Sequence, residues 1–233
     1  MQGECTITRG YMIHMRRKYS KKKNIAYWIG KIWLWLFGWQ LVGETEFPLK
    51  FVLIAVPHTS NWDLSFMLAS SYVLRIRVRW LGKHTLFTGL KGRFLRALGG
   101  LAVDRYSSHN LVEQIAGVFN NSENLILAVP PEGTRGKTDY WKSGFYHIAR
   151  AANVPIAYSF LDYNRRRCGI GGFLTPTGDL HADMEFLREF YKGIQGKFPE
   201  NVCEPRLREE SETGEFERPA ARNSAEQKPT QCK

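Results

Sequence analysis

The chain has 233 residues, of which 43% are hydrophobic, and its formal net charge is +11. This length and hydrophobic content argue against a disordered chain and suffice for one sizeable α/β core. The positive charge favours an anionic partner, which leaves nucleic acid, anionic lipid and a phosphorylated substrate as candidates. The four cysteines have neither metal-ligand nor redox spacing, so we expect reduced thiols in a protein that faces the cytosol.

The N-terminal segment is basic and precedes an apolar run rich in tryptophan. Residues 1–24 carry a dense cluster of lysines and arginines, and no cleavable signal peptide is expected. Residues 25–42 contain four tryptophans and are interrupted by Lys31 and Gln40. Tryptophan favours the headgroup region of a bilayer, and cations beside it are attracted to an anionic leaflet. We therefore expect 25–42 to be a membrane-associating helix, spanning or lying flat; a helix packed on the core is the alternative.

A histidine and an aspartate follow the most apolar short run of the chain. Residues 51–56 predict a buried strand that Pro57 ends, and residues 64–74 have helical spacing. His58 then lies at the end of a strand and Asp63 in the first turn of a helix, where α/β proteins bind ligands. A neutral imidazole whose tautomer is fixed by a carboxylate can act as a general base toward a substrate hydroxyl. A structural histidine and a helix-capping aspartate are the alternative for so short a pattern.

Strands and helices continue to alternate after this motif. Residues 75–80 alternate arginine with apolar residues and predict a strand with one basic face, with Lys83 just beyond it. A short strand at 101–103 is expected between helices at 91–98 and 107–119.

A further buried strand, residues 125–129, runs into a turn with the sequence Pro-Pro-Glu-Gly-Thr-Arg. Gly133 permits a backbone geometry that exposes amides, Thr134 adds a hydroxyl donor, and Arg135 offers a bidentate fork. Together these groups suit an anion of phosphate size. The turn is not a Walker loop because the Gly-Lys-Ser/Thr ending is absent. A surface turn with a solvated arginine is the alternative.

The rest of the chain completes an α/β pattern. It predicts two helices and two strands, in the order 143–152, 154–161, 168–174 and 180–194. Beyond these, residues 199–233 contain few apolar side chains, and we expect them to be disordered. Residues 43–198 are thus predicted to form a single α/β domain, a mixed, mostly parallel sheet flanked by helices, behind an N-terminal membrane-associating helix.

Four short motifs follow one another along the chain as in the glycerolipid acyltransferase family, which acylates lysophosphatidic acid (1-acyl-glycerol-3-phosphate). By these motifs the chain resembles that family. The resemblance covers about residues 28–198 and is more specific than any one motif alone. The matching stretches are a His-x4-Asp block with His58, Ser60 and Asp63, then Gly100 to Arg105, Pro131 to Arg135 and Val154 to Ile156.

The resemblance implies transfer of a fatty acyl group from acyl-CoA or acyl carrier protein to a hydroxyl of a lysophospholipid, in phospholipid synthesis. In that scheme His58 is the base, Asp63 orients it, and neither a metal nor a cofactor is required. The substrate-binding residues that it implies are Ser60, Lys83, Arg105, Glu132, Gly133, Thr134 and Arg135, with Glu132 shaping the loop. We expect a position at the cytoplasmic face of the inner membrane, peripheral or held by one helix, against an anionic membrane surface and without nucleic acid.

Departures from the family pattern concern the lipid more than the chemistry. Val129 and Pro130 replace the usual aromatic residue, and Tyr158 stands where a proline is expected, so another lysolipid or an amino-acid lipid stays open as the acceptor. A serine hydrolase is disfavoured because no Gly-x-Ser-x-Gly elbow occurs. A non-catalytic membrane- or nucleic-acid-binding module fits the charge and the tryptophans, but it does not require His58 and Asp63.

Overall fold

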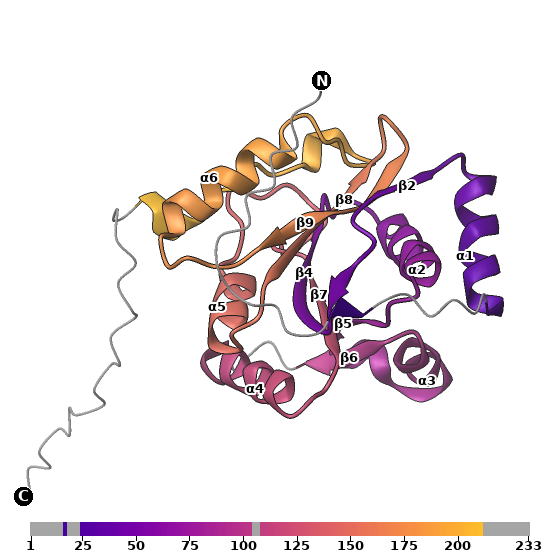
Figure 1. Cartoon of the computed structure of the whole chain (residues 1–233), viewed down its shortest axis with the longest axis horizontal. Helices are drawn as coiled ribbons and strands as arrows, with labels where there is room; N and C mark the ends of the chain where they lie inside the picture. The colour runs from indigo at the N-terminus through magenta and orange to yellow at the C-terminus, as the bar shows by residue number, and fades with distance from the viewer. Residues whose placement is uncertain (1–15, 18–23, 104–107, 212–233) are drawn as a thin grey trace, which may run out of the picture.

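The most apolar short run of the chain forms β4 (Lys50–Val56), the central strand of a seven-stranded sheet (Figure 1). The computed structural model describes residues 16–17, 24–103 and 108–211. Its sheet has the order β2-β9-β8-β4-β7-β5-β6. The other six strands are β2 (Gln40–Gly43), β5 (Val78–Lys83), β6 (Gly100–Val103), β7 (Leu125–Val129), β8 (Ile156–Asp162) and β9 (Arg167–Leu174).

Parallel pairing brings the carboxyl ends of the central strands to one edge. β4 pairs in parallel with both β7 and β8, β5 pairs in parallel with β7 and β6, and β8 and β9 are antiparallel. The side chains of Val52 and Ile54 are fully buried, as a central strand covered on both faces requires. A short pair, β1 (Arg16–Arg17) and β3 (Phe47–Pro48), lies outside this sheet. The predicted single α/β domain with a mixed, mostly parallel sheet is confirmed.

Within the described residues, six helices cover the two faces of the sheet. They are α1 (Ile25–Leu36), α2 (Trp62–Leu74), α3 (Gly89–Ala97), α4 (Ser108–Asn120), α5 (Gly144–Ala151) and α6 (Leu180–Tyr191). The helices α4, α5 and α6 share one hydrophobic core with Val52, Ile54 and Val56 of β4. The helix α2 packs on the opposite face, through Leu74 and Met67 against Phe51 and Leu53. The helices α1 and α3 lie on the same side as α2 (Figure 1).

The tryptophan-rich helix is shorter than the range 25–42 that we expected. It ends at Leu36, and Gly38 follows with a φ of +69°, a left-handed conformation that glycine adopts readily. Residues 40–43 then leave the helix and form the edge strand β2, parallel to β9. Trp39 is buried and stacks on Phe66 of α2, with 4.3 Å between the ring centroids. No helix of the described residues has the length and apolar content that crossing a membrane requires.

The C-terminal boundary predicted at residue 198 also differs from the structure. Residues 199–211 pack on the domain through two 3-10 turns, Pro199–Asn201 and Arg208–Ser211. Leu207 is fully buried and forms a β-bridge with Trp141, because this segment covers the open side of the core beside α6. Most of the basic N-terminal cluster and residues 212–233 lie outside the described residues.

Candidate active site at the carboxyl edge of the sheet

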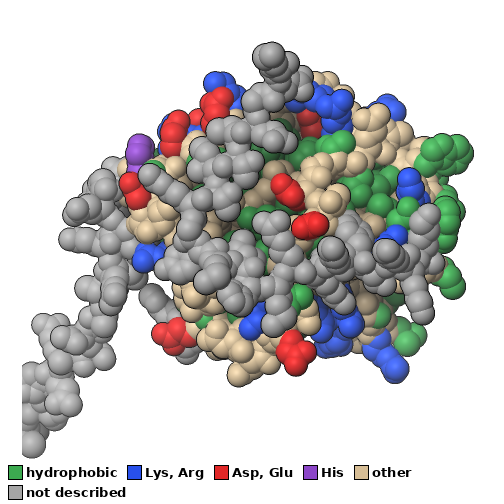
Figure 2. Space-filling view, in the orientation of Figure 1, with side chains coloured by type: hydrophobic (Ala, Val, Ile, Leu, Met, Phe, Trp, Pro, Cys, Tyr) green, Lys and Arg blue, Asp and Glu red, His purple; other side chains and the backbone are tan. Residues whose placement is uncertain are grey.

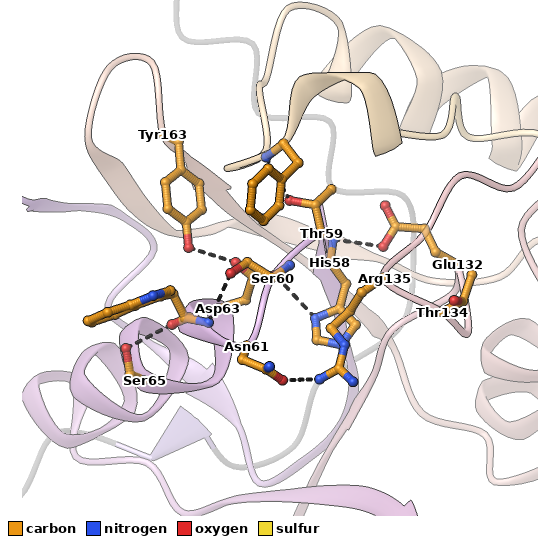
Figure 3. Close-up of polar contacts among 12 residues, drawn as sticks. His58, Thr59, Ser60, Asn61, Asp63, Ser65, Glu132, Thr134, Arg135 and Tyr163 are labelled. Atoms are coloured by element: carbon orange, nitrogen blue, oxygen red, sulfur yellow. Dashed lines mark hydrogen bonds and ion pairs between the residues drawn. The ribbon is translucent and has the colours of Figure 1, made fainter.

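The predicted histidine and aspartate lie together where β4 ends and α2 begins (Figure 3). The loop from Pro57 to Asn61 connects the two elements, and Asp63 occupies the first turn of α2. A carboxylate at this position is favoured by the positive end of the helix dipole. The side chain of His58 is 25% exposed, whereas that of Asp63 is 5% exposed, so the imidazole is open to a ligand while its partner is enclosed.

Asp63 is held by three neighbours at once. Its Oδ2 lies 3.4 Å from Nδ1 of His58 and accepts a 2.7 Å hydrogen bond from the backbone N–H of Ser60. Its Oδ1 accepts a 2.6 Å hydrogen bond from the hydroxyl of Tyr163. The carboxylate can therefore fix the tautomer of His58 with Nδ1 inward, which leaves Nε2 as the nitrogen available to a substrate. Burial and the charge of Asp63 raise the pKa of Tyr163, which keeps its hydroxyl a donor.

Ser60 acts in this loop through its backbone and its hydroxyl. Its Oγ accepts a 3.2 Å hydrogen bond from the backbone N–H of Trp62, so it helps to set the turn into α2. The side chain of Ser60 is buried. The structure thus places Ser60 beside His58 and Asp63 and gives it a loop-forming contact; its substrate-binding role stays a prediction.

Glu132 joins the loop after β7 to the loop after β4. Its Oε2 accepts a 2.7 Å hydrogen bond from the backbone N–H of His58, 74 positions earlier in the chain. This contact fixes the residue that carries the imidazole, in addition to the predicted role of Glu132 in its own loop. Glu132 is only 2% exposed, and its Oε1 has no hydrogen-bond partner among the described residues.

Burial dominates the ionisation of Glu132. Desolvation, with a smaller contribution from the charge of Asp63, raises the pKa of Glu132 from 4.5 to about 8, against the opposing hydrogen bond from His58. The carboxyl group is therefore neutral at physiological pH. A neutral Glu132 avoids placing a second negative charge beside Asp63.

The predicted anion turn lies next to this pair. Gly133 has a φ of +68°, and its backbone N–H donates to the carbonyl of Pro130 at 3.1 Å, so glycine is required for the tight turn. Thr134 Oγ1 accepts a 3.3 Å hydrogen bond from the N–H of Gly136. Arg135 is exposed and donates from its guanidinium to Oδ1 of Asn61 (Figure 3). The turn is thereby linked to the His58 loop through Asn61.

Two other predicted residues are only partly placed. Lys83 is the last residue of β5, and its backbone pairs with Val103 at the same carboxyl edge of the sheet. The side-chain placement of Lys83 and all of Arg105 lie outside the described part of the structure. The described site therefore comprises His58, Ser60 and Asp63 from the junction of β4 and α2, and Glu132 to Arg135 from the turn after β7.

Lys197 and Phe198, which follow α6 in the chain, contact the loop that carries His58. The backbone N–H of Phe198 donates to Oγ1 of Thr59 at 3.3 Å, and the ammonium of Lys197 lies 4.8 Å from the ring centroid of Trp62. A cavity of about 440 Å³ lies between α6 and residues 202–205, and it reaches Val56 and Pro57. The cavity thus borders the residue that precedes His58.

Sequence reasoning missed the two contacts that complete the site. Tyr163 follows the carboxyl end of β8, the parallel neighbour of β4. This position at the ligand-binding edge of the sheet could have identified Tyr163 as a site residue. Asn61 precedes α2 at its N-cap position, where its side chain makes no capping hydrogen bond and instead accepts from Arg135. No group of three or more His, Cys, Asp or Glu side chains within residues 24–103 and 108–211 is arranged to hold a metal ion.

Comparisons with known proteins agree with this architecture. The family model described as Acyltransferase matches residues 40–157, half of the chain, and this stretch contains both loops of the site. Among solved structures, the chain is similar to the 1-acyl-sn-glycerophosphate (LPA) acyltransferase PlsC from Thermotoga maritima. The TM-score is 0.52 at 15% sequence identity, over 72% of this chain and 77% of that chain, which is a likeness of fold. No curated protein matches the chain.

The raised pKa of Glu132 predicts a pH-dependent stability. Below pH 4.5 the acid is protonated in both the folded and the unfolded chain, whereas between pH 4.5 and about 8 only the folded chain holds the proton. The free energy of unfolding should therefore fall as the pH rises from 5 to 8, by about 3 kcal/mol relative to Glu132→Gln. Urea unfolding at several pH values measures the difference between the two proteins. If the free energy of unfolding changes with pH by the same amount in wild type and Glu132→Gln, the raised pKa of Glu132 is contradicted. Glu189→Gln, on the exposed face of α6, is the control.

Proposed function

Because the chain belongs to the acyltransferase family, we propose that it transfers a fatty acyl group from a thioester donor to a free hydroxyl of a lysophospholipid, most simply 1-acyl-glycerol-3-phosphate. The observation that carries the proposal is the pairing of His58 with the enclosed Asp63, beside a turn that presents an arginine. A base and an anion site at one sheet edge suit an acceptor that carries both a hydroxyl and a phosphate.

The chemistry follows from the orientation of the imidazole. Nε2 of His58 takes the proton of the acceptor hydroxyl as its oxygen attacks the thioester carbonyl carbon. Asp63 stabilises the imidazolium that forms, through its contact with Nδ1. The tetrahedral intermediate then collapses with cleavage of the carbon–sulfur bond, and the departing thiolate takes the proton back from His58. No covalent bond to the protein is formed in this sequence.

Arg135 is the proposed anchor for the phosphate of the acceptor. Its guanidinium has five N–H donors, and the contact with Asn61 engages one nitrogen and orients the group along the His58 loop. The hydroxyl of Thr134 belongs to the same turn and is proposed as a second donor to the phosphate. Ser60, Lys83 and Arg105 are proposed as further acceptor contacts, since Ser60 borders His58, Lys83 ends β5, and Arg105 comes two positions after β6 in the sequence.

We propose acyl-CoA or acyl carrier protein as the donor, with no further cofactor. The cavity beside Val56 and Pro57 adjoins the base and is the place we assign to the acyl thioester. The proposed setting is an anionic membrane surface on the cytoplasmic side. The helix α1 has 12 residues, which is about 18 Å of helix and well short of a bilayer core, so we propose that α1 lies in the interface.

The base is tested by thiol release from an acyl thioester. Wild-type protein should release thiol only when lysolipid is added, and His58→Ala should reduce that rate to background while the protein stays folded. The matched control is His181→Ala, since His181 is an exposed histidine on α6 and belongs to neither loop of the site. Release without lysolipid would indicate a hydrolase instead. If neither acyl-CoA nor acyl carrier protein supports release with any acceptor, the acyltransferase proposal fails.

The phosphate anchor is tested by the acceptor dependence of Arg135→Ala. Loss of a charge-assisted contact with a phosphate should raise the KM for a phosphorylated lysolipid roughly 10- to 100-fold, while the KM for the thioester changes little. Lys137→Ala in the same turn provides the matched control. If Arg135→Ala affects a phosphate-free lysolipid equally, Arg135 does not serve the phosphate.

A further inference from the structure

The helix α3 exposes large apolar side chains and buries a glycine. Leu90 is 84% exposed and Phe94 is 62% exposed, and Leu86 in the preceding 3-10 turn is 41% exposed. Leu90 and Phe94 are four positions apart within α3, so they form an apolar stripe on one face of the helix. The buried residue of α3 is Gly92. A surface helix of a soluble domain normally has the opposite pattern, with its apolar stripe against the core.

The inward face of α3 is fixed by close packing. A side chain at Gly92 would meet the backbone of Phe87 at about 2.1 Å, so α3 lies directly against that residue. Phe87 is 3% exposed, and its ring fills the space over Gly82 of β5 and Gly100 of β6. These contacts determine which side of α3 faces the core. The packing of Gly92 against Phe87 therefore holds Leu90 and Phe94 on the exposed side of α3.

The apolar stripe of α3 is bordered by positive charge alone. Lys91, Arg93 and Arg96 are all exposed, and no acidic residue occurs within Gly89–Ala97. None of the three has an ion pair with another described residue. An apolar stripe with a cationic border is the pattern of an interfacial helix on an anionic membrane.

The helix α1 has a matching face on the same side of the molecule. Trp28, Ile29, Ile32 and Trp35 are all more than half exposed, and Lys31 is exposed among them. Figure 1 shows α1 and α3 on the side of the sheet that α2 covers, opposite α4 and α5. Figure 2 shows hydrophobic surface at this end of the molecule, with lysine and arginine surface beside it.

We propose that α3 is a second membrane contact, which together with α1 sets the orientation of the domain on an anionic bilayer. One contact helix would leave the domain free to rotate about it, whereas two separated contacts define a plane. A second copy of the chain is a poorer occupant, because docking two such stripes would bring their lysines and arginines together. The proposal extends the proposed membrane association of α1 to another element, and it holds whether or not acyl transfer is observed.

The test is binding to vesicles, which does not depend on catalysis. Vesicles of phosphatidylglycerol and phosphatidylcholine are sedimented with the full chain, its Leu90→Glu/Phe94→Glu variant and a Phe186→Glu control. Phe186 is 45% exposed on α6, which packs on the opposite face of the sheet. We expect the partition coefficient of the double variant to fall at least tenfold and that of the control to stay within twofold. Unchanged binding of the double variant, or an equal loss in the control, would overturn the proposal.

Hydrogen exchange on the unmodified protein gives a second, independent readout. Addition of the same vesicles should slow amide exchange at residues 86–97 and leave residues 180–191 unchanged. If α3 exchanges at the same rate with and without vesicles, α3 does not contact the bilayer. A change of oligomeric state in the double variant with unaltered vesicle binding would assign the stripe to contacts between copies and overturn the proposal.

Discussion

The hydrogen bond from the backbone N–H of His58 to Glu132 is the contact on which the rest of the site depends. Parallel pairing of β4 with β7 brings the two strand ends to one edge, but it does not fix the loops that leave them. The Glu132 contact supplies that constraint at 2.7 Å, and the hydrogen bond between Arg135 and Asn61 adds a second cross-link between the same loops. The imidazole and the anion turn are thus positioned relative to each other before any ligand arrives. Such preorganisation lowers the cost of bringing two reactants together.

Burial assigns different roles to the two acidic groups at this edge. Asp63 is enclosed but accepts from Ser60 and Tyr163 and contacts His58, so its negative charge is compensated. Glu132 has one such donor, and burial raises its pKa to about 8. Glu132 therefore acts as a neutral structural group, while Asp63 contacts the imidazole of His58. An ionised Glu132 would be repelled by the negative charge of Asp63.

The chemistry-bearing residues were predictable because they follow directly from strand ends. The apolar run of β4 and the turn after β7 are local patterns, and they located His58, Asp63 and the Glu132–Arg135 turn. Tyr163 could not be found in this way, since its contact with Asp63 spans 100 positions and depends on how the β8 loop folds back. The local pattern likewise identified the turn that contains Glu132, but it did not reveal that the carboxyl group of Glu132 reaches the backbone of His58.

The errors at element boundaries have a common physical cause. Trp39 was grouped with the membrane-facing tryptophans because composition does not distinguish a buried indole from an exposed one, yet it stacks on Phe66 in the core. Arg75 was assigned to a strand, but it has a φ of 53° and ends α2. The segment around Leu207 is polar on average, yet Cys203, Pro205 and Leu207 are buried and anchor it. Tertiary packing decided each of these cases against the local pattern.

The central claim is that one sheet edge holds the acceptor hydroxyl at His58 and the acceptor phosphate at Arg135. A crystal structure of the protein with lysophosphatidic acid, without a thioester donor, tests this claim most directly. The account predicts the free hydroxyl about 2.6–3.2 Å from Nε2 of His58, with the phosphate hydrogen-bonded to the guanidinium of Arg135. A lipid bound with its hydroxyl away from His58, or with its phosphate on other cations while Arg135 contacts only solvent and Asn61, would contradict it.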